Sequence, residues 1–97
     1  MKLARIVYSP VARHYIQHLP PALKAPLREA IEELELEPLK GKPLQEEFEG
    51  FRSHRFKKYR VIYRYREKQN RVEILFGGPR SNVYTLFSDY LKKLQSH

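Results

Sequence analysis

Residues 59–66 alternate between apolar or aromatic side chains and mostly cationic ones. The odd positions are Tyr59, Val61, Tyr63 and Tyr65, and the even positions are Arg60, Ile62, Arg64 and Arg66. Successive side chains of a β-strand point to opposite faces of a sheet. The pattern therefore predicts a strand with one aromatic face and one largely cationic face.

A second β-prone run, residues 51–56, ends just before this strand, with Lys57 and Lys58 between them. If the two lysines form a tight turn, Arg55 lies across from Arg60 on the same face of a hairpin. Like charges placed in that way destabilise a sheet by a few tenths of a kcal/mol or more. We therefore expect the fold to hold an anion at this pair.

The first third of the chain predicts a short strand and two helices. Residues 3–8 are β-prone, and Ser9-Pro10 supplies an N-cap followed by proline at the first helical position. This helix should end before Pro20-Pro21. Apolar residues at three- and four-residue steps from Leu23 predict a second helix that closes before Pro38. Pro26 allows two interpretations, a helix that starts near residue 25 or one that starts at Pro21 and is kinked.

The rest of the chain predicts a meander and a last helix. Residues 39–49 form a connector, and residues 71–76 form a further strand in which Val72, Ile74 and Phe76 share a face. Gly77-Gly78-Pro79 should end that strand, and Ser81 or Asn82 should cap the helix that follows. The order β, α, α, β, β, β, α predicts an α+β fold with an antiparallel meander sheet, helices packed on one face, and the arginine-bearing face free.

Composition narrows the class of protein. Ninety-seven residues suffice for one domain. The formal charge of +8 favours a polyanionic partner such as RNA, DNA, a ribosome or an acidic protein. We expect no membrane association, because no apolar run approaches the roughly 20 residues of a span. The chain has no cysteine, which excludes disulfides and thiolate chemistry and is compatible with a reducing compartment. We expect a cytoplasmic protein.

Several short motifs, in this order and spacing, resemble the RelE/ParE superfamily of toxins from toxin-antitoxin pairs. They are Ile6-Val7-Tyr8-Ser9-Pro10, the helix end at Glu33-Leu34 to Pro38, Gly41-Lys42-Pro43-Leu44, Gly50 with Arg55, Tyr59-Arg60-Val61-Ile62-Tyr63, and Gly77-Gly78-Pro79-Arg80 with Val83-Tyr84. The resemblance covers nearly the whole chain and implies one RelE-like domain over residues 1–97. It also implies a cognate antitoxin as partner and contact with DNA only through the toxin-antitoxin complex.

The resemblance implies one of two activities. RelE-like members are ribosome-dependent endoribonucleases that cut messenger RNA, and ParE-like members inhibit DNA gyrase without those catalytic residues. Arg60, Arg80 and Tyr84 stand where the RelE-type pattern has its strand arginine, loop arginine and late tyrosine. This favours RNA cleavage on the ribosome. Gyrase inhibition and a harmless basic RNA-binding domain remain the alternatives.

RNA cleavage without a cofactor or metal requires a base for the 2′-hydroxyl, stabilisation of phosphoryl charge, and a proton for the leaving oxygen. Arg60 and Arg80, with Arg55, suit the phosphate because a guanidinium contacts it through two donors. Tyr84 is a candidate base, since nearby cations and a helix N-terminus favour a phenolate. His54 is the rival base because histidine titrates near neutrality.

Four further basic residues are expected to hold RNA backbone without reading sequence: Arg52, Lys57, Lys58 and Arg64. A metal site is not expected. His14 and His18 have a spacing that can bind a metal, but no third histidine or cysteine ligand stands near them in the sequence.

Overall fold

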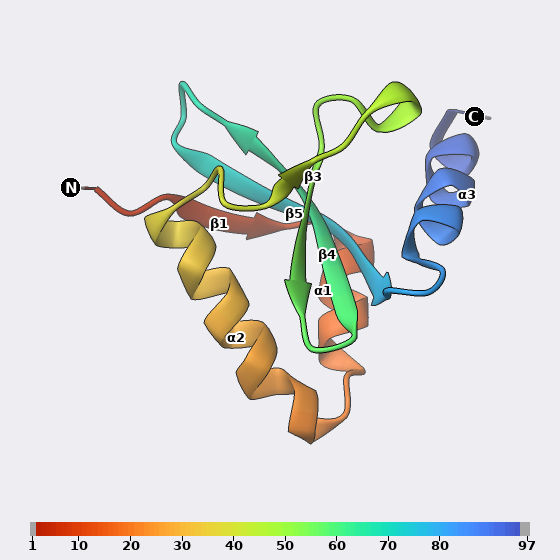
Figure 1. The fold of residues 1–97 in the computed structure, drawn as a ribbon, viewed down its shortest axis with the longest axis horizontal. Helices are drawn as coiled ribbons and strands as arrows, with labels where there is room; N and C mark the ends of the chain where they lie inside the picture. The colour runs from red at the N-terminus through yellow and green to blue at the C-terminus, as the bar shows by residue number, and fades with distance from the viewer. Residues whose placement is uncertain (1, 96–97) are drawn as a thin grey trace.

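The computed structural model describes residues 2–95, which form a five-stranded sheet with three α-helices (Figure 1). The strands are β1 (Arg5–Tyr8), β2 (Lys42–Pro43), β3 (Arg52–Phe56), β4 (Tyr59–Arg66) and β5 (Arg71–Pro79). The helices are α1 (Pro10–Gln17), α2 (Pro21–Leu36) and α3 (Val83–Gln95), and a short 3-10 turn, η1, spans Glu46–Phe48. The predicted α+β class and element order are confirmed. The two-residue β2 and η1 lie in the stretch that was expected to be a plain connector.

The sheet is mixed, with the strand order β1-β5-β4-β3-β2. Strands β2 to β5 pair antiparallel with their neighbours, as the predicted meander requires. Strand β1 adds to the free edge of β5 in parallel, with Arg5 opposite Arg71 and Tyr8 opposite Ile74. The N-terminal strand thus lies beside the last strand of the chain.

The aromatic face of β4 packs under α1 and α2. Val61 and Tyr63 are fully buried there, together with Leu27 and Leu34 of α2. Tyr59 and Tyr65 are partly buried against the same cluster. The predicted division of β4 into an aromatic face and a cationic face is therefore confirmed, and burial of the aromatic side chains stabilises this half of the molecule.

The opposite face of the sheet is not free, which corrects the sequence prediction. Helix α3 packs on it through Val83 and Phe87, which are buried with Ile62 of β4. The Phe87 ring lies 5.2 Å from that of Phe51 and 5.5 Å from that of Phe76. Figure 1 shows α3 well separated from α1 and α2. Ile62 accounts for the difference, because it places one apolar side chain among the arginines of β4 and so gives α3 a surface to cover.

Both N-terminal helices begin where the sequence predicts a helix start. The Ser9 hydroxyl accepts a hydrogen bond from the Ala12 N–H over 3.0 Å, and Pro10 is the first residue of α1. Helix α2 begins at Pro21 and runs through Pro26 to Leu36. The structure therefore decides between the two interpretations of Pro26, in favour of the earlier start.

Strand β5 differs from its prediction in two ways. The register with β4 shifts next to Ile62 and Tyr63, so that Phe76 pairs with Ile62 while Ile74 pairs with Tyr63. This bulge turns Phe76 toward α3 while Ile74 packs under the other helices, so the two do not share a face. The strand also continues through the two glycines to Pro79 instead of ending at Phe76.

Candidate active site

The hairpin between β3 and β4 turns at Lys57 and Lys58, as predicted. Phe56 pairs with Tyr59 across the two-residue turn, and Lys57 has a φ of 53°, which a two-residue hairpin turn requires. In this register Arg55 is the direct cross-strand partner of Arg60. The sequence prediction of two opposed arginines is confirmed.

Arg60 occupies the centre of this region. It pairs with Arg55 on one side and with Gly78 of β5 on the other. Its side chain is partly buried, and its Nε is buried without a hydrogen-bond partner within residues 2–95. Buried polar groups usually have a partner. The two guanidiniums side by side are suited to an anionic ligand.

Gly78 lets the start of α3 come close to Arg60. A Cβ atom at position 78 would lie 3.3 Å from Cγ2 of Val83, which is a tight contact. Val83 is the first residue of α3 and is fully buried. The absence of a side chain at position 78 therefore places the N-terminal turn of α3 directly against the strand that neighbours Arg60.

Arg80 stands at the same end of the sheet. Its backbone N–H donates to the carbonyl oxygen of Lys58 over 2.8 Å, which fixes the start of the loop beside the lysine turn. The residue is exposed. Arg80 follows Pro79, the cross-strand partner of Tyr59, so its backbone lies two residues beyond the row that contains Arg60 and Gly78.

Tyr84 reaches the same face from the first turn of α3. Its hydroxyl donates to the Ser53 hydroxyl over 3.1 Å. Ser53 is buried and pairs with Ile62, so it occupies the row next to the Arg55–Arg60 pair on the same face. Adjacent same-face rows are about 7 Å apart along a strand. The Tyr84 hydroxyl is thereby held next to the two arginines.

These residues form what we name the arginine-tyrosine cluster: Ser53, Arg55, Arg60, Arg80 and Tyr84. Lys57 and Lys58 flank it in the exposed turn. Guanidiniums can bind phosphate oxygens and a phenol can exchange a proton, so the cluster contains the groups that phosphodiester chemistry requires. Ser53 was not singled out from the sequence. Its position two residues before Arg55 on a strand was the available signal.

His54 does not join this cluster, which corrects its expected place beside the arginines. It lies on the opposite face of β3, 9% exposed, and its Nε2 is 3.0 Å from Oε1 of Glu33 on α2. Lys40 binds the other carboxylate oxygen over 2.9 Å. Hydrogen bonds from Lys40 and then from His54 lower the pKa of Glu33. The alternation of β3 explains the placement, because Arg55 and His54 are neighbours and must face opposite sides.

Arg52 also lies on the His54 side of β3. Its guanidinium donates to the carbonyl oxygens of Leu39 and Gly41 over 3.1 and 2.8 Å. The hydroxyl of Tyr63 donates to the Pro38 carbonyl over 2.7 Å and accepts from the Gly41 N–H over 2.9 Å. Arg52 therefore helps to hold the connector after α2 and is not placed beside the arginine-tyrosine cluster.

Arg64 faces the same side as Arg60 but lies toward the other end of β4. It binds Glu73 over 3.2 Å, and its guanidinium carbon lies 5.8 Å from the centre of the Phe51 ring. Arg66 and Arg71 bind the same carboxylate. Burial raises the pKa of Glu73, but hydrogen bonds from the three arginines outweigh it and hold the pKa below its usual value.

Residues 2–95 contain no group of three or more histidine, cysteine or acidic side chains arranged to hold a metal ion. The His14 and His18 rings lie 4.1 Å apart, and His18 Nδ1 is 2.8 Å from the carbonyl oxygen of His14. Within the same residues, no helix is both long enough and apolar enough to span a membrane.

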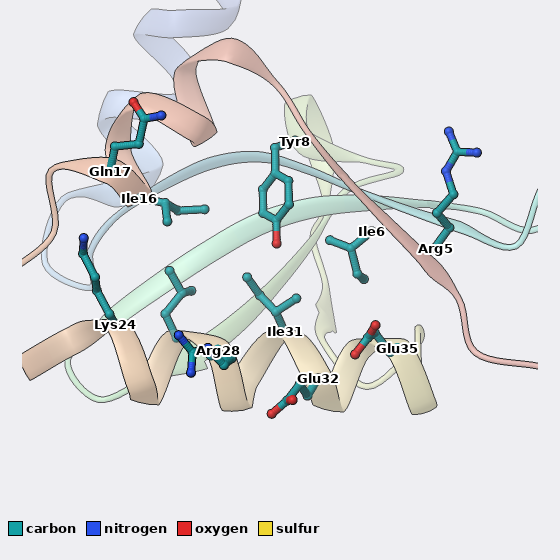
Figure 2. A pocket seen from close by; sticks show the side chains of 11 residues that line it. Arg5, Ile6, Tyr8, Ile16, Gln17, Lys24, Arg28, Ile31, Glu32 and Glu35 are labelled. Carbon is teal, nitrogen blue, oxygen red and sulfur yellow. The ribbon is translucent and has the colours of Figure 1, made fainter. Parts of the chain in front are cut away.

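A groove of about 610 Å³ lies on the opposite side of the molecule from the arginine-tyrosine cluster, between β1 and α2 (Figure 2). Tyr8 and Ile6 extend from β1 toward Ile31 of α2, and charged side chains of both signs line its borders. Burial, with a smaller contribution from Glu35, raises the pKa of Tyr8. The groove contains none of the residues expected to be catalytic.

Comparison with known proteins places the chain in a family. Residues 6–84 match the family model described as the ParE toxin of the type II toxin-antitoxin system parDE. Toxin RelG of Mycobacterium tuberculosis is 37% identical over 79 residues, which cover 79% of this chain and 91% of that protein. The chain is a type II toxin of the RelE/ParE superfamily.

Solved structures of similar proteins superpose on most of this toxin. One chain of the RelBE2 toxin-antitoxin complex of M. tuberculosis superposes with a TM-score of 0.73 at 34% identity, covering 79% of this toxin and 98% of that chain. A chain of the archaeal RelE-RelB complex of Pyrococcus horikoshii gives 0.66 at 28% identity, covering 80% and 96%. The isolated Escherichia coli RelE toxin gives 0.68 at 18% identity, covering 94% and 98%, which shows a shared fold.

Proposed function

We propose that this toxin is a ribosome-dependent endoribonuclease that cleaves messenger RNA with its own side chains. The observation that carries the proposal is Arg60, which faces Arg55 across the hairpin with a buried, unpaired Nε, next to the row that holds the Tyr84 hydroxyl. An anion bound to the two guanidiniums would offset the repulsion between the arginines.

In the proposed reaction, the ribose 2′-hydroxyl attacks the adjacent phosphorus and the bond to the 5′-oxygen breaks. Arg60 and Arg55 bind the non-bridging oxygens, where negative charge increases in the transition state. Tyr84 acts as the general base that takes the proton of the 2′-hydroxyl, which requires that its own hydroxyl no longer donates to Ser53. Arg80, on the exposed loop beside Lys58, stabilises the leaving oxygen. The products are a cyclic phosphate and a 5′-hydroxyl, whose proton comes from water.

Messenger RNA bound to ribosomes provides the test. Purified toxin is added to a defined translation mixture, and cleavage of the message is followed by primer extension. Arg80→Ala should lose most of the cleavage. Arg13→Ala removes the same charge from an exposed position on α1 and should cleave as the unaltered toxin does. Equal cleavage by Arg80→Ala and Arg13→Ala would contradict the assignment of Arg80.

The matching family model gives a second candidate, inhibition of DNA gyrase by binding, because its description names ParE. This activity needs the fold and the charge but not the Tyr84 hydroxyl. Inhibition of supercoiling that persists in Tyr84→Phe, with messages intact, would favour it over cleavage.

We also propose a cognate antitoxin as the physiological partner. The similar chains of M. tuberculosis and P. horikoshii were solved as toxin-antitoxin complexes. A chain of formal charge +8 favours an acidic segment that folds on binding. Helix α3 covers the centre of the arginine-bearing face, so binding there should alter hydrogen exchange over residues 82–94. Unchanged exchange in that helix would place the antitoxin elsewhere.

A further inference from the structure

A second set of arginines surrounds Glu73, at the end of the sheet away from the arginine-tyrosine cluster. Arg64 and Arg71 each donate two hydrogen bonds to the Glu73 carboxylate, and Arg66 donates one, at distances of 2.8–3.2 Å. The Glu73 side chain is 15% exposed, whereas the side chains of Arg64, Arg66 and Arg71 are 37%, 43% and 31% exposed. Glu73 thus lies beneath three guanidiniums that solvent can reach.

Arg5 extends this set onto β1. It is the parallel partner of Arg71, and residues opposite one another in a parallel pair point to the same face. Figure 2 shows the Arg5 side chain directed away from α2, whereas Ile6 is directed toward α2. We name Arg5, Arg64, Arg66 and Arg71, with Glu73, the Glu73 patch. Four arginines and one carboxylate give it a formal charge of +3, while Glu67 and Lys68 of the adjoining turn cancel one another.

Stabilisation of the hairpin does not account for so many arginines. One carboxylate neutralises one guanidinium, and Arg66 is the direct cross-strand partner of Arg71, an arrangement that destabilises a sheet. Three guanidiniums carry fifteen N–H donors, and the five bonds to Glu73 use five of them. The Glu73 carboxylate thus holds three guanidiniums side by side and leaves their other N–H donors available for a ligand.

We propose that the Glu73 patch is a second RNA-binding surface of this toxin, one that holds the phosphodiester backbone away from the bond that is cut. Arginine forks match phosphate geometry, and prior fixation by Glu73 reduces the side-chain entropy lost on binding. The patch shares a sheet face with Arg60, and along β4 its members Arg64 and Arg66 lie about 13 and about 20 Å from it. The longer span equals about six nucleotide steps of a stacked strand. Only the choice of RNA as the ligand of the patch rests on the proposed function.

RNA binding in a background that does not depend on cleavage tests the inference. All proteins carry Arg80→Ala, and the probe is a fluorescently labelled single-stranded RNA of about 20 nucleotides, long enough to span both clusters. Arg66→Ala with Arg71→Ala removes two charges from the Glu73 patch. Arg13→Ala with Arg28→Ala removes two charges from α1 and α2 and is the matched control. Dissociation constants are measured between about 50 and 200 mM salt.

The patch variant should bind RNA about tenfold more weakly than the control, and its plot of log affinity against log salt should be shallower by about 1.4, the value for two lost phosphate contacts to a single strand. Arg5→Ala leaves all five bonds to Glu73 intact and should weaken binding about threefold, which separates loss of contact from loss of folding. Equal affinities and slopes for the patch and control variants would overturn the inference. A patch variant that binds the antitoxin more weakly but binds RNA with unchanged affinity would also overturn the inference.

Failure of the inference and failure of the proposed function give different results. If the toxin does not cleave messages but the patch variants lose RNA affinity, the Glu73 patch binds RNA and the nuclease assignment is wrong. If cleavage depends on Arg80 while the patch variants bind RNA as the control does, the nuclease assignment stands and the patch is an ion-pair network of the hairpin alone.

Discussion

The Tyr84 hydroxyl donates a hydrogen bond to the Ser53 hydroxyl, and this 3.1 Å contact joins the first turn of α3 to β3. The bond joins residues 31 positions apart in the chain and sets how far the Tyr84 hydroxyl lies above the sheet. Ser53 is 2% exposed, so its position is fixed by the strand and by the side chains around it. The place of the phenol relative to Arg60 depends on β3 as well as on α3.

Replacing either partner of this bond should separate chemistry from positioning. Tyr84→Phe removes the proton acceptor and should lower message cleavage by about 100-fold. Ser53→Ala keeps the phenol but releases it, and should lower cleavage about fivefold, which corresponds to about 1 kcal/mol for one hydrogen bond. Single-turnover rates on ribosome-bound messages measure both. A Ser53→Ala rate as low as that of Tyr84→Phe would mean that Ser53 itself takes part in the reaction.

Arg60 is expected to act through its forked geometry as well as its charge. Arg60→Ala should reduce the cleavage rate by about 100- to 1,000-fold, the usual loss for one donor to a developing oxyanion. Arg60→Lys keeps the charge but offers no paired donors and should recover only a small part of that loss. Arg13→Lys on α1 is the control. Full activity in Arg60→Lys would show that a point charge suffices.

His54 should matter for stability and not for cleavage. His54→Ala removes a buried side chain and the partner of a Glu33 carboxylate oxygen, and should lower the free energy of unfolding by about 1–3 kcal/mol. Urea unfolding measures this. Cleavage per folded molecule should stay within about twofold of the unaltered toxin, because direct chemistry by a general base is worth far more than that. A 100-fold loss of cleavage would restore His54 as a catalytic residue.

Glu73 should make stability sensitive to acid. The pKa of its carboxyl is lowered from 4.5 in the folded protein, although burial alone would raise it, because Arg66, Arg71 and Arg64 donate to the carboxylate. A lowered folded-state pKa gives stability that is present above the unfolded pKa and is lost as pH falls through the folded pKa. The free energy of unfolding of the unaltered toxin should therefore exceed that of Glu73→Gln at pH 7, and the difference should shrink below pH 4.5. A constant difference between pH 7 and pH 3 would exclude this linkage.

The sequence predicted the hairpin well because its information is local. Alternation in residues 59–66 and a two-residue turn at Lys57 and Lys58 were sufficient to place Arg55 across from Arg60, and both depend on neighbours in the chain. Once one face of the hairpin is aromatic and is buried, the turn length leaves little freedom in how β3 pairs with β4. The N-cap at Ser9 is of the same kind.

The features that were missed depend on distant contacts. The alternation of Ile74 and Phe76 is interrupted by a bulge opposite Ile62, and no feature of β5 alone signals an extra residue. His54 was judged by its chemistry, although alternation with Arg55 already places it on the opposite face, and its contact with Glu33 of α2 is visible only in the fold. Predicting that α3 covers this face would have required Ile62, alone among the arginines of β4, to be recognised as a contact for a helix. Whether the assembled cluster cleaves RNA stays a prediction.

The parallel pairing of β1 with β5 also governs when the toxin becomes complete during its synthesis. Arg5 of β1 pairs with Arg71 of β5, so during synthesis β1 leaves the ribosome long before the strand with which it pairs. Arg80 and Tyr84 emerge later still. A nascent chain on the ribosome therefore carries an unfinished sheet and an incomplete set of cluster residues until the segment around Tyr84 has emerged.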